Sequence, residues 1–429
     1  MSVQAMPGTN PHPLRAEVRA LLQAAMAVFT FTVVIGILNG TDLVDFDRKR
    51  ILAHVHGGTL GWITMSVFAA SLWLFGQGEL TPGMRRAARA LTVFAIVALP
   101  VFAFTFAFTY GEARPIIGSF ALAAIIGFFA WVTIRARGMT LSVVHIGFLA
   151  AVATSVAGGV LGVLLATKIA TGREVLPDGG ADAHPATMVV GFLIPVGMAL
   201  AEWCFHWEKL KPAGRGGFLQ IALPFLGGML LMVSLLLDAT AIAPLAALLE
   251  LAGVVIFIKR LWPSFRAVNW AVPSMARYAA AASIGILFNI LLLNYLAGRY
   301  AGDFDNVPTG NLLALDHTMF IGVLTNAIFG LLFAAVPARL RERTPLAGQA
   351  IFFGMNVGLL GFVAGLLFEV TLLKRIFTPI MGVAILASLA LHTYWLWEAR
   401  RATEGIGPYG RALPCPVFPR PVEAAVGRC

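Results

Sequence analysis

The sequence predicts an all-α membrane protein of about twelve transmembrane helices, and three observations lead to that class. The chain of 429 residues is 59% hydrophobic, and only 12% of its residues are charged. Soluble domains carry about 25% charged residues, and the mean hydropathy of this chain is +0.84. Its apolar residues form long uninterrupted runs rather than the alternating segments of about ten residues that build a transmembrane barrel. Because backbone polar groups in lipid must be satisfied within a segment, we expect these runs to be helices.

Each apolar run is close to the ~20 residues that cross a bilayer, with some excess for tilt. We expect twelve spans, at residues 17–40, 51–77, 86–110, 113–136, 140–168, 184–207, 216–236, 239–262, 275–298, 311–338, 347–373 and 375–399. The transmembrane domain then occupies residues 17–401. Residues 1–16 and 402–429 contain several prolines and are expected to form irregular tails.

The net charge of +10 has a pattern that indicates membrane topology. Most of the 31 lysines and arginines lie in the N-terminal tail, in the loops after even-numbered spans and in the C-terminal tail. By the positive-inside rule, both termini are expected to be cytoplasmic, in a bacterial plasma (inner) membrane. Since the basic residues report topology, membrane lipid is an expected partner and nucleic acid is not.

Four histidines are expected at one depth in the outer half of the membrane. His54 and His56 begin span 2, His184 begins span 6, and His317 lies about two turns into span 10. The following sequences are similar: HGGTLGW, HPATMVVGF and HTMFIGV each have a glycine five or seven residues after the histidine. The equal spacing of four spans predicts three four-helix units in the same orientation, in a pseudo-threefold arrangement.

The stretch HVHGGTLGW places two histidines only two residues apart. On a helix this separation is about 200°, so His54 and His56 point to opposite sides and suit two separate sites, or one site and one hydrogen bond. Gly57, Gly58 and Gly61 leave room for close helix packing or for a flat macrocycle. Neutral imidazole is a common ligand of metals and haem, although an intramembrane histidine can also simply hydrogen-bond to a neighbouring helix.

This stretch, together with histidines on spans 2, 6 and 10, resembles the catalytic subunits of the haem-copper oxidase superfamily, especially cbb3-type oxidases and nitric oxide reductases. The chain is also similar, more loosely, to NnrS-type haem proteins. The resemblance implies three four-helix arcs, one or two b-type haems, a cytochrome or quinol as electron donor, and a partner membrane subunit. It also implies that Lys374 and Arg375, between spans 11 and 12, contact haem propionates, with Arg114 and Arg299 as further cations on the same side.

The chain departs from that superfamily in two respects. Its HVH pair lies on span 2, whereas the superfamily has such a pair on span 10. Span 7, GGFLQIALPFLGGMLLMVSLLLD, contains no His, Tyr or Cys, so the usual copper ligands are missing. Copper is therefore the less favoured cofactor, and oxygen reduction of the ordinary kind is not expected. Haem binding does not depend on these residues.

The leading hypothesis is a haem protein for electron transfer, or for binding or reduction of a diatomic gas such as nitric oxide; as an enzyme it would be a haem-dependent oxidoreductase. We expect His56 and His317 to form a bis-histidine pair, and His54 to serve a second haem or a metal with His184. Glu250, in the middle of span 8, is a candidate proton relay or a neutral packed carboxyl. Two other classes stay open: a proton-coupled transporter or channel, and a haem-free assembly or anchor subunit.

Overall fold

The computed structural model describes residues 12–207, 209–300 and 306–403. Within these ranges the chain is helical, and eleven helices are long and apolar enough to cross a membrane. Most of each predicted tail lies outside the described residues. Where the boundary is described, the first helix begins at Arg15 and the last continues to Thr403. The prediction of an all-α polytopic membrane protein is confirmed.

The helices fall into three units of four spans, in chain order. Unit 1 contains α1 (Arg15–Gly40), a span made of α2 (Arg48–His56), η1 (Gly57–Thr64) and α3 (Met65–Phe75), then α4 (Pro82–Phe108) and α5 (Ala113–Ala136). Unit 2 contains α6 (Val143–Thr171), a span made of α7 (Gly180–Ala186), η2 (Thr187–Leu193) and α8 (Ile194–Phe205), then α9 (Arg215–Leu236), the short η3 (Thr240–Ile242) and α10 (Ala243–Arg266). Unit 3 contains α11 (Met275–Arg299), a span made of α12 (Thr309–His317), η5 (Thr318–Thr325) and α13 (Asn326–Ala335), then the short α14 (Ala338–Arg341), α15 (Pro345–Leu367) and α16 (Thr371–Thr403).

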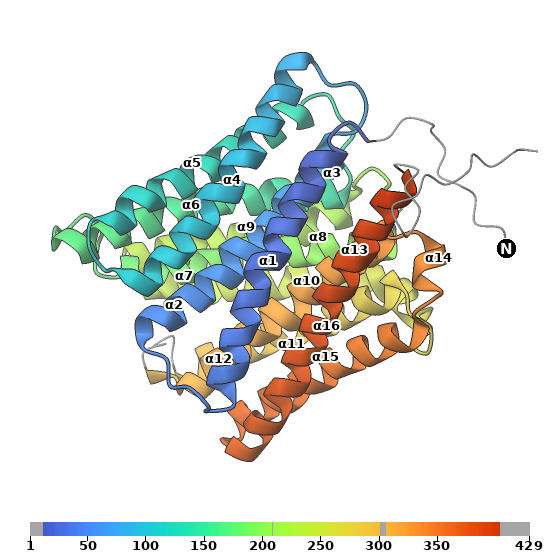
Figure 1. The fold of residues 1–429 in the computed structure, drawn as a ribbon. Helices are drawn as coiled ribbons and strands as arrows, with labels where there is room; N and C mark the ends of the chain where they lie inside the picture. Colours follow the sequence, from blue (N-terminus) through green and yellow to red (C-terminus); the bar gives the residue numbers. More distant parts are fainter. Residues whose placement is uncertain (1–11, 208, 301–305, 404–429) are drawn as a thin grey trace, which may run out of the picture.

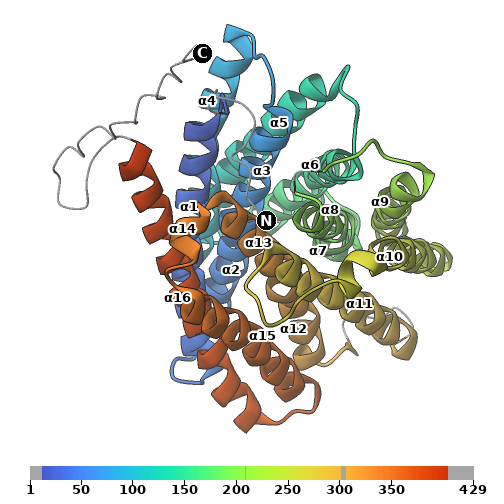
Figure 2. The same ribbon diagram turned by 90° about the vertical axis from the view of Figure 1, so that its right-hand side faces the viewer.

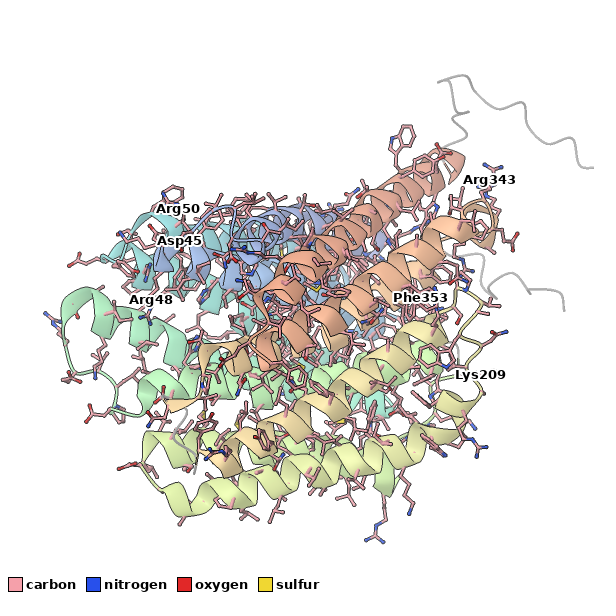
Figure 3. The ribbon with its side chains drawn as sticks, turned by 90° about the horizontal axis from the view of Figure 1, so that it is seen from below. Asp45, Arg48, Arg50, Lys209, Arg343 and Phe353 are labelled. Carbon is pink, nitrogen blue, oxygen red and sulfur yellow. The ribbon has the colours of Figure 1, made fainter. Side chains whose placement is uncertain are left out.

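Helix α10 is the twelfth long helix and corresponds to the predicted span 8. It has 24 residues and packs along α9. It is not among the eleven helices that are apolar enough to cross a membrane, because Glu250, Lys259 and Arg260 interrupt its apolar sequence. Charged residues otherwise gather toward the ends of the bundle: in Figure 3, Asp45, Arg48 and Arg50 lie at one end, and Lys209 and Arg343 lie at the other. This distribution suits a slab of lipid around the middle of the helices.

The three units repeat the same packing, which confirms the pseudo-threefold arrangement. In each unit the first helix packs on the second span, the second span packs on the third helix, and the third helix packs on the fourth. The units join through α5 with α6, α10 with α11, and α16 with α1. The last contact closes the ring, and Figure 1 shows α16 beside α1. Figure 2 shows α3, α8 and α13 near the middle of the bundle, with the other helices around them.

The second span of each unit is the most buried of its unit. In the three second spans, 72–83% of the most apolar window is buried, against 33–50% in the other eight candidate spans. Each second span also contains a π-helical segment, η1, η2 or η5. Such segments are rare and are found often at functional sites. These three spans therefore form the core of the molecule.

The repeated glycine of the three histidine motifs lies at the same place in each π-helical segment. These residues are Gly61, Gly191 and Gly322. Gly61 and Gly191 face the first helix of their own unit; a Cβ at Gly61, for example, would lie 2.2 Å from Cγ1 of Val28. A Cβ at Gly322 would lie 3.1 Å from Leu359 on α15 and 4.0 Å from Gly285 on the first helix, α11. The absent side chain lets the first helix and the central span of each unit approach closely.

Candidate functional site

Four histidines occupy equivalent positions on the central spans. One position lies three residues before each π-helical segment and holds His54, His184 or Leu315. The other lies directly before it and holds His56, Ala186 or His317. All four predicted ligands are thus on the central spans, at the end of the bundle where α2, α7 and α12 begin.

The histidines at the first position donate a hydrogen bond to the first helix of their own unit. His54 Nδ1 lies 2.9 Å from the Thr32 carbonyl oxygen, and His184 Nδ1 lies 2.8 Å from that of Gly158. The histidines at the second position donate within their own helix. His56 Nδ1 lies 2.8 Å from the carbonyl oxygen of Leu52.

His317 repeats the bond of His56, with Nδ1 2.8 Å from the carbonyl oxygen of Leu313. Because a carbonyl can only accept, each of the four Nδ1 atoms carries the proton, and each Nε2 presents a lone pair. In the part of the chain that the structure describes, none of these Nε2 atoms makes a hydrogen bond. A fixed Nδ1 proton and a free Nε2 are typical of metal-ligating histidine.

Two glycines make room for the rings at the first position. A Cβ at Gly36 would lie 3.2 Å from Cε1 of His54, and a Cβ at Gly162 would lie 2.8 Å from Cε1 of His184. Each glycine follows the carbonyl that accepts the Nδ1 hydrogen bond by four residues. The two rings are therefore seated in the same way on α1 and on α6.

The two histidines of the HVH stretch face different neighbouring helices. His54 lies beside α1, where its ring is hydrogen-bonded to Thr32, and His56 lies against α4, where its ring stacks on Phe106. An electrostatic interaction relates His54 to His317 and His56 to His184, so these combinations are candidates beside the expected pairs. The expected pairs, His56 with His317 and His54 with His184, stay predictions.

The third boundary, between units 2 and 3, has no histidine at these positions. The threefold relation assigns it Ala186 and Leu315, two apolar side chains.

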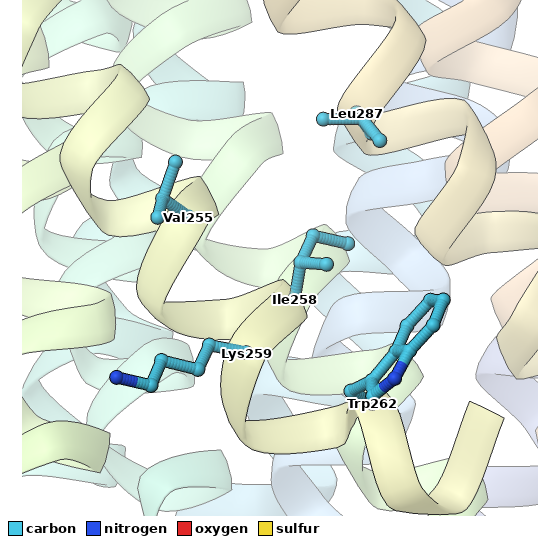
Figure 4. A pocket seen from close by; sticks show the side chains of 5 residues that line it. All are labelled: Val255, Ile258, Lys259, Trp262 and Leu287. Carbon is cyan, nitrogen blue, oxygen red and sulfur yellow. The ribbon is translucent and has the colours of Figure 1, made fainter. Parts of the chain in front are cut away.

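A groove of about 330 Å³ opens at this third boundary between α10 and α11, lined by Val255, Ile258, Lys259, Trp262 and Leu287. Figure 4 shows the Lys259 amine pointing away from Leu287. This groove is apolar and is lined by none of the four histidines, so it is not part of the candidate site.

Aromatic rings lie beside the histidines at the second position. His56 stacks on Phe106 with ring centroids 3.8 Å apart, and His317 meets the Phe362 ring edge-to-face at 4.9 Å. Among the described residues, no group of three or more His, Cys, Asp or Glu side chains could hold a metal ion.

The remaining intramembrane histidines differ from these four. His145 and His392 are buried, and their Nε2 atoms are enclosed without a hydrogen-bond partner. His145 caps α6 through Ser142. The four candidate ligands are only half-buried, so their rings are not closed off by packing. His392 repeats the hydrogen bond of His56 and His317, with Nδ1 2.8 Å from the Ser388 carbonyl oxygen, and differs from the four in being fully buried.

Lys374 and Arg375, the predicted propionate partners, lie in the first turns of α16 and share one carboxylate. Lys374 Nζ is 2.7 Å from Oδ1 of Asp42, and Arg375 Nε is 2.8 Å from Oδ2. Asp42 follows α1, which carries Gly36 beside His54. The hydrogen bonds from Lys374 and then Arg375 hold the pKa of Asp42 below its ordinary value. One negative charge against two positive charges leaves this cluster cationic.

We expect the stabilisation that Asp42 provides to persist at neutral and mildly acidic pH. A lowered folded-state pKa means that this stability is complete above the unfolded-state pKa of about 3.9 and is lost as the pH falls through the folded value. The Asp42→Asn variant removes the charge and keeps a residue that tolerates the positive φ of 57° at this position. Thermal unfolding in detergent from pH 7 to pH 3 should show a wild-type advantage that is constant at pH 5–7 and disappears at the acidic end. An advantage that instead grew on acidification would contradict this account.

Glu250 is buried inside unit 2 and is not brought to either histidine pair. It lies between α9 and α10, where a Cβ at Gly227 would be 2.9 Å from its Oε1. Neither carboxyl oxygen has a hydrogen bond of ordinary geometry, although the Gly228 amide lies nearby. The proton-relay hypothesis for Glu250 thus has no structural connection to the histidines.

A polar cluster that sequence reasoning missed joins the three helices at the other end of unit 2. Glu202 on α8 accepts hydrogen bonds from Arg260 on α10 and from Gln220 on α9. The sequence did contain a signal for this cluster. Glu202 is a carboxylate within an apolar span, and such residues are rarely left unpaired in a membrane.

Comparison with known proteins adds no family to this description. The chain matches no protein-family model and no curated protein. The class that the fold defines is a polytopic helical membrane protein with three repeated units and four histidines on its central spans.

Proposed function

We propose that this membrane protein binds a b-type haem that His54 and His317 would hold at the boundary of units 3 and 1, and that it transfers electrons. The observation that carries the proposal is that two half-buried imidazoles each donate Nδ1 to a backbone carbonyl and keep Nε2 available. A haem held by two histidines would have no free position for a gas, which favours electron transfer over gas binding. When bound, haem would supply one-electron redox chemistry.

The surrounding residues would position such a cofactor. The carbonyl oxygens of Thr32 and Leu313 fix the orientation of the two imidazoles, as outer hydrogen bonds do at metal sites. The cationic cluster of Lys374 and Arg375 with Asp42 supplies charge for haem propionates.

The resemblance to the haem-copper oxidase superfamily supports this assignment, because the pair lies on spans 2 and 10, two of the spans that carry metal ligands there. The copper ligands of that superfamily have no counterpart on α9, so the proposal includes no copper centre. We further propose a bacterial plasma membrane location, cytoplasmic termini, and a quinol or cytochrome as electron donor. A partner membrane subunit would fit the same superfamily.

Absorption spectra of the purified protein test the proposal: oxidised, reduced with dithionite, and reduced in the presence of carbon monoxide. We expect a Soret band and split visible bands that carbon monoxide leaves unchanged. His54→Ala and His317→Ala should each remove the signal of this haem, while His206→Ala, outside both pairs, should leave it intact.

Two other outcomes would change the assignment. A Soret shift with carbon monoxide would indicate an open coordination position and gas chemistry. The absence of any Soret band after haem supplementation would overturn haem binding and favour the transporter or the anchor subunit.

A further inference from the structure

We infer that the groove between α10 and α11 binds one anionic phospholipid, with an acyl chain along the groove and the phosphate held by Lys259 and Arg266. The groove lies where units 2 and 3 meet and is lined by none of the four histidines. The inference is independent of the proposed haem, because it uses none of the residues that would hold that cofactor.

The size and lining of the groove suit an acyl chain. Its volume is about 330 Å³, and a smaller pocket of about 70 Å³ shares Ile258, Trp262 and Leu287 with it. This second pocket adds Leu261 and Ser283, which are each only 3% exposed, so the groove deepens between the two helices. A helix is about 10 Å across with its side chains and is too wide for such a groove, whereas an acyl chain is a single row of methylenes.

The two cations share the face of α10 that forms the groove. The groove residues of this face and the last residue of α10 are four, three and four residues apart, which places them in one stripe: Val255, Lys259, Trp262 and Arg266. The stripe rises about 16 Å at 1.5 Å per residue. The stem of Lys259 lines the groove, and Figure 4 shows its amine pointing away from Leu287. A lipid along this stripe would have its acyl chain at the Val255 end and its headgroup at the Arg266 end.

Aromatic side chains mark the level of the membrane surface at this end of the groove. Trp262 is 50% exposed and stacks on Phe265 with ring centroids 5.6 Å apart. Trp270, just after α10, is 38% exposed and meets Phe265 edge-to-face. Tryptophan is enriched where lipid headgroups meet water, and lysine extends its amine to that level from slightly deeper positions. The cations therefore lie at the depth of lipid phosphates.

The charge around the groove is complementary to an anionic headgroup. Residues 202–217 and 256–277, which meet at this end of the bundle, contain seven lysines and arginines but only two carboxylates. One of the two, Glu202, is taken by Arg260. Neither Lys259 nor Arg266 forms an ion pair with a carboxylate of residues 12–207, 209–300 or 306–403. Basic pockets between helices at the cytoplasmic surface bind anionic lipid headgroups, and the charge pattern assigns this end to the cytoplasm.

Competition between defined phospholipids for the purified full-length protein tests the inference. The protein is stripped of lipid in an uncharged detergent, and unlabelled lipids then compete with a fluorescent phosphatidylglycerol. We expect one saturable site that prefers phosphatidylglycerol to phosphatidylcholine of the same acyl chains. Each cation near an anionic lipid contributes about fivefold to binding, and salt screens this attraction. The preference should therefore be at least about fivefold and should shrink in high salt.

Two variants separate the headgroup end of the site from its acyl end. Lys259→Gln combined with Arg266→Gln should abolish the preference for phosphatidylglycerol and leave the binding of phosphatidylcholine unchanged. Leu287→Trp fills the groove and should weaken the binding of both lipids. If either variant folds poorly, the lipid preference of the wild type and its dependence on salt still test the site.

Matched controls change the same chemistry elsewhere on the molecule. Arg85→Gln with Arg86→Gln removes two exposed charges near the start of α4, and Val160→Trp enlarges a 39% exposed side chain on α6. Both should bind lipid as the wild type does.

Three results would overturn the lipid site. These are equal affinity of the wild type for the two lipids, an equal loss of binding in the controls, and a dimer in uncharged detergent that Leu287→Trp dissociates. The last would assign the groove to a second copy of the chain. Because none of these measurements needs haem, a protein without a Soret band would overturn the proposed function and leave the lipid site standing.

Discussion

Replacing Glu202 with alanine is expected to lower the free energy of unfolding by about 3 kcal/mol, the lower end of the range for breaking a buried ion pair. Glu202 is 6% exposed and its oxygens lie 2.9 and 3.0 Å from the two terminal nitrogens of Arg260. It also accepts from Gln220 at 2.9 Å. Without the carboxylate, the Arg260 guanidinium and the Gln220 amide lose their shared acceptor at the contact of α8, α9 and α10. The lower end applies because the Arg260 side chain remains 30% exposed.

Matched variants separate this effect from the loss of side-chain volume. Glu202→Gln keeps an acceptor and should cost less than alanine, and adding Arg260→Met to it should recover stability because the unpaired charge is gone. Glu174→Ala removes an ion pair in which the carboxylate is 71% exposed, and should cost less than about 1 kcal/mol. Unfolding by SDS in mixed micelles measures the free energy of unfolding of all four variants. Equal losses of stability in Glu202→Ala and Glu174→Ala would contradict a stabilising buried network.

Replacing Gly228 with alanine is expected to destabilise the protein by about 1–3 kcal/mol through overpacking. Its Cβ would lie 2.4 Å from the Cα and 2.8 Å from the N of Gly191. Both atoms belong to the backbone of η2, which cannot move aside as a flexible side chain can. Helix α9 would therefore be displaced from the central span of unit 2. The melting temperature in detergent should fall.

Gly298→Ala is the control for this substitution. Gly298 lies near the end of α11, and a Cβ there would meet nothing within 4 Å. Because alanine favours a helix over glycine by up to about 1 kcal/mol, this variant should be as stable as the wild type or slightly more stable. If Gly298→Ala lost as much stability as Gly228→Ala, the cause would be the change in the helix backbone itself and not a clash with a neighbouring helix.

The positions of the spans could be predicted because hydropathy is a local property. The expected spans at residues 51–77 and 184–207 correspond to Arg48–Phe75 and Gly180–Phe205 in the structure. The similarity of the three histidine motifs also predicted the repeat, since equivalent positions in equivalent units face equivalent neighbours. The π-helical segments were not predicted. Their backbone i to i−5 hydrogen bonds have no marker in the local sequence.

The sequence by itself determined that the chain is a helical membrane protein and that His54, His56, His184 and His317 share one level, because both follow from residue types and their spacing. It also determined that His54 and His56 diverge, through the rotation per residue of a helix. Only the tertiary structure decided which helix each ring contacts: His54 is hydrogen-bonded to Thr32 on α1, and His56 stacks on Phe106 of α4, the ring that the Arg114 guanidinium also covers. Those contacts depend on how helices distant in sequence pack against one another, which no local pattern specifies.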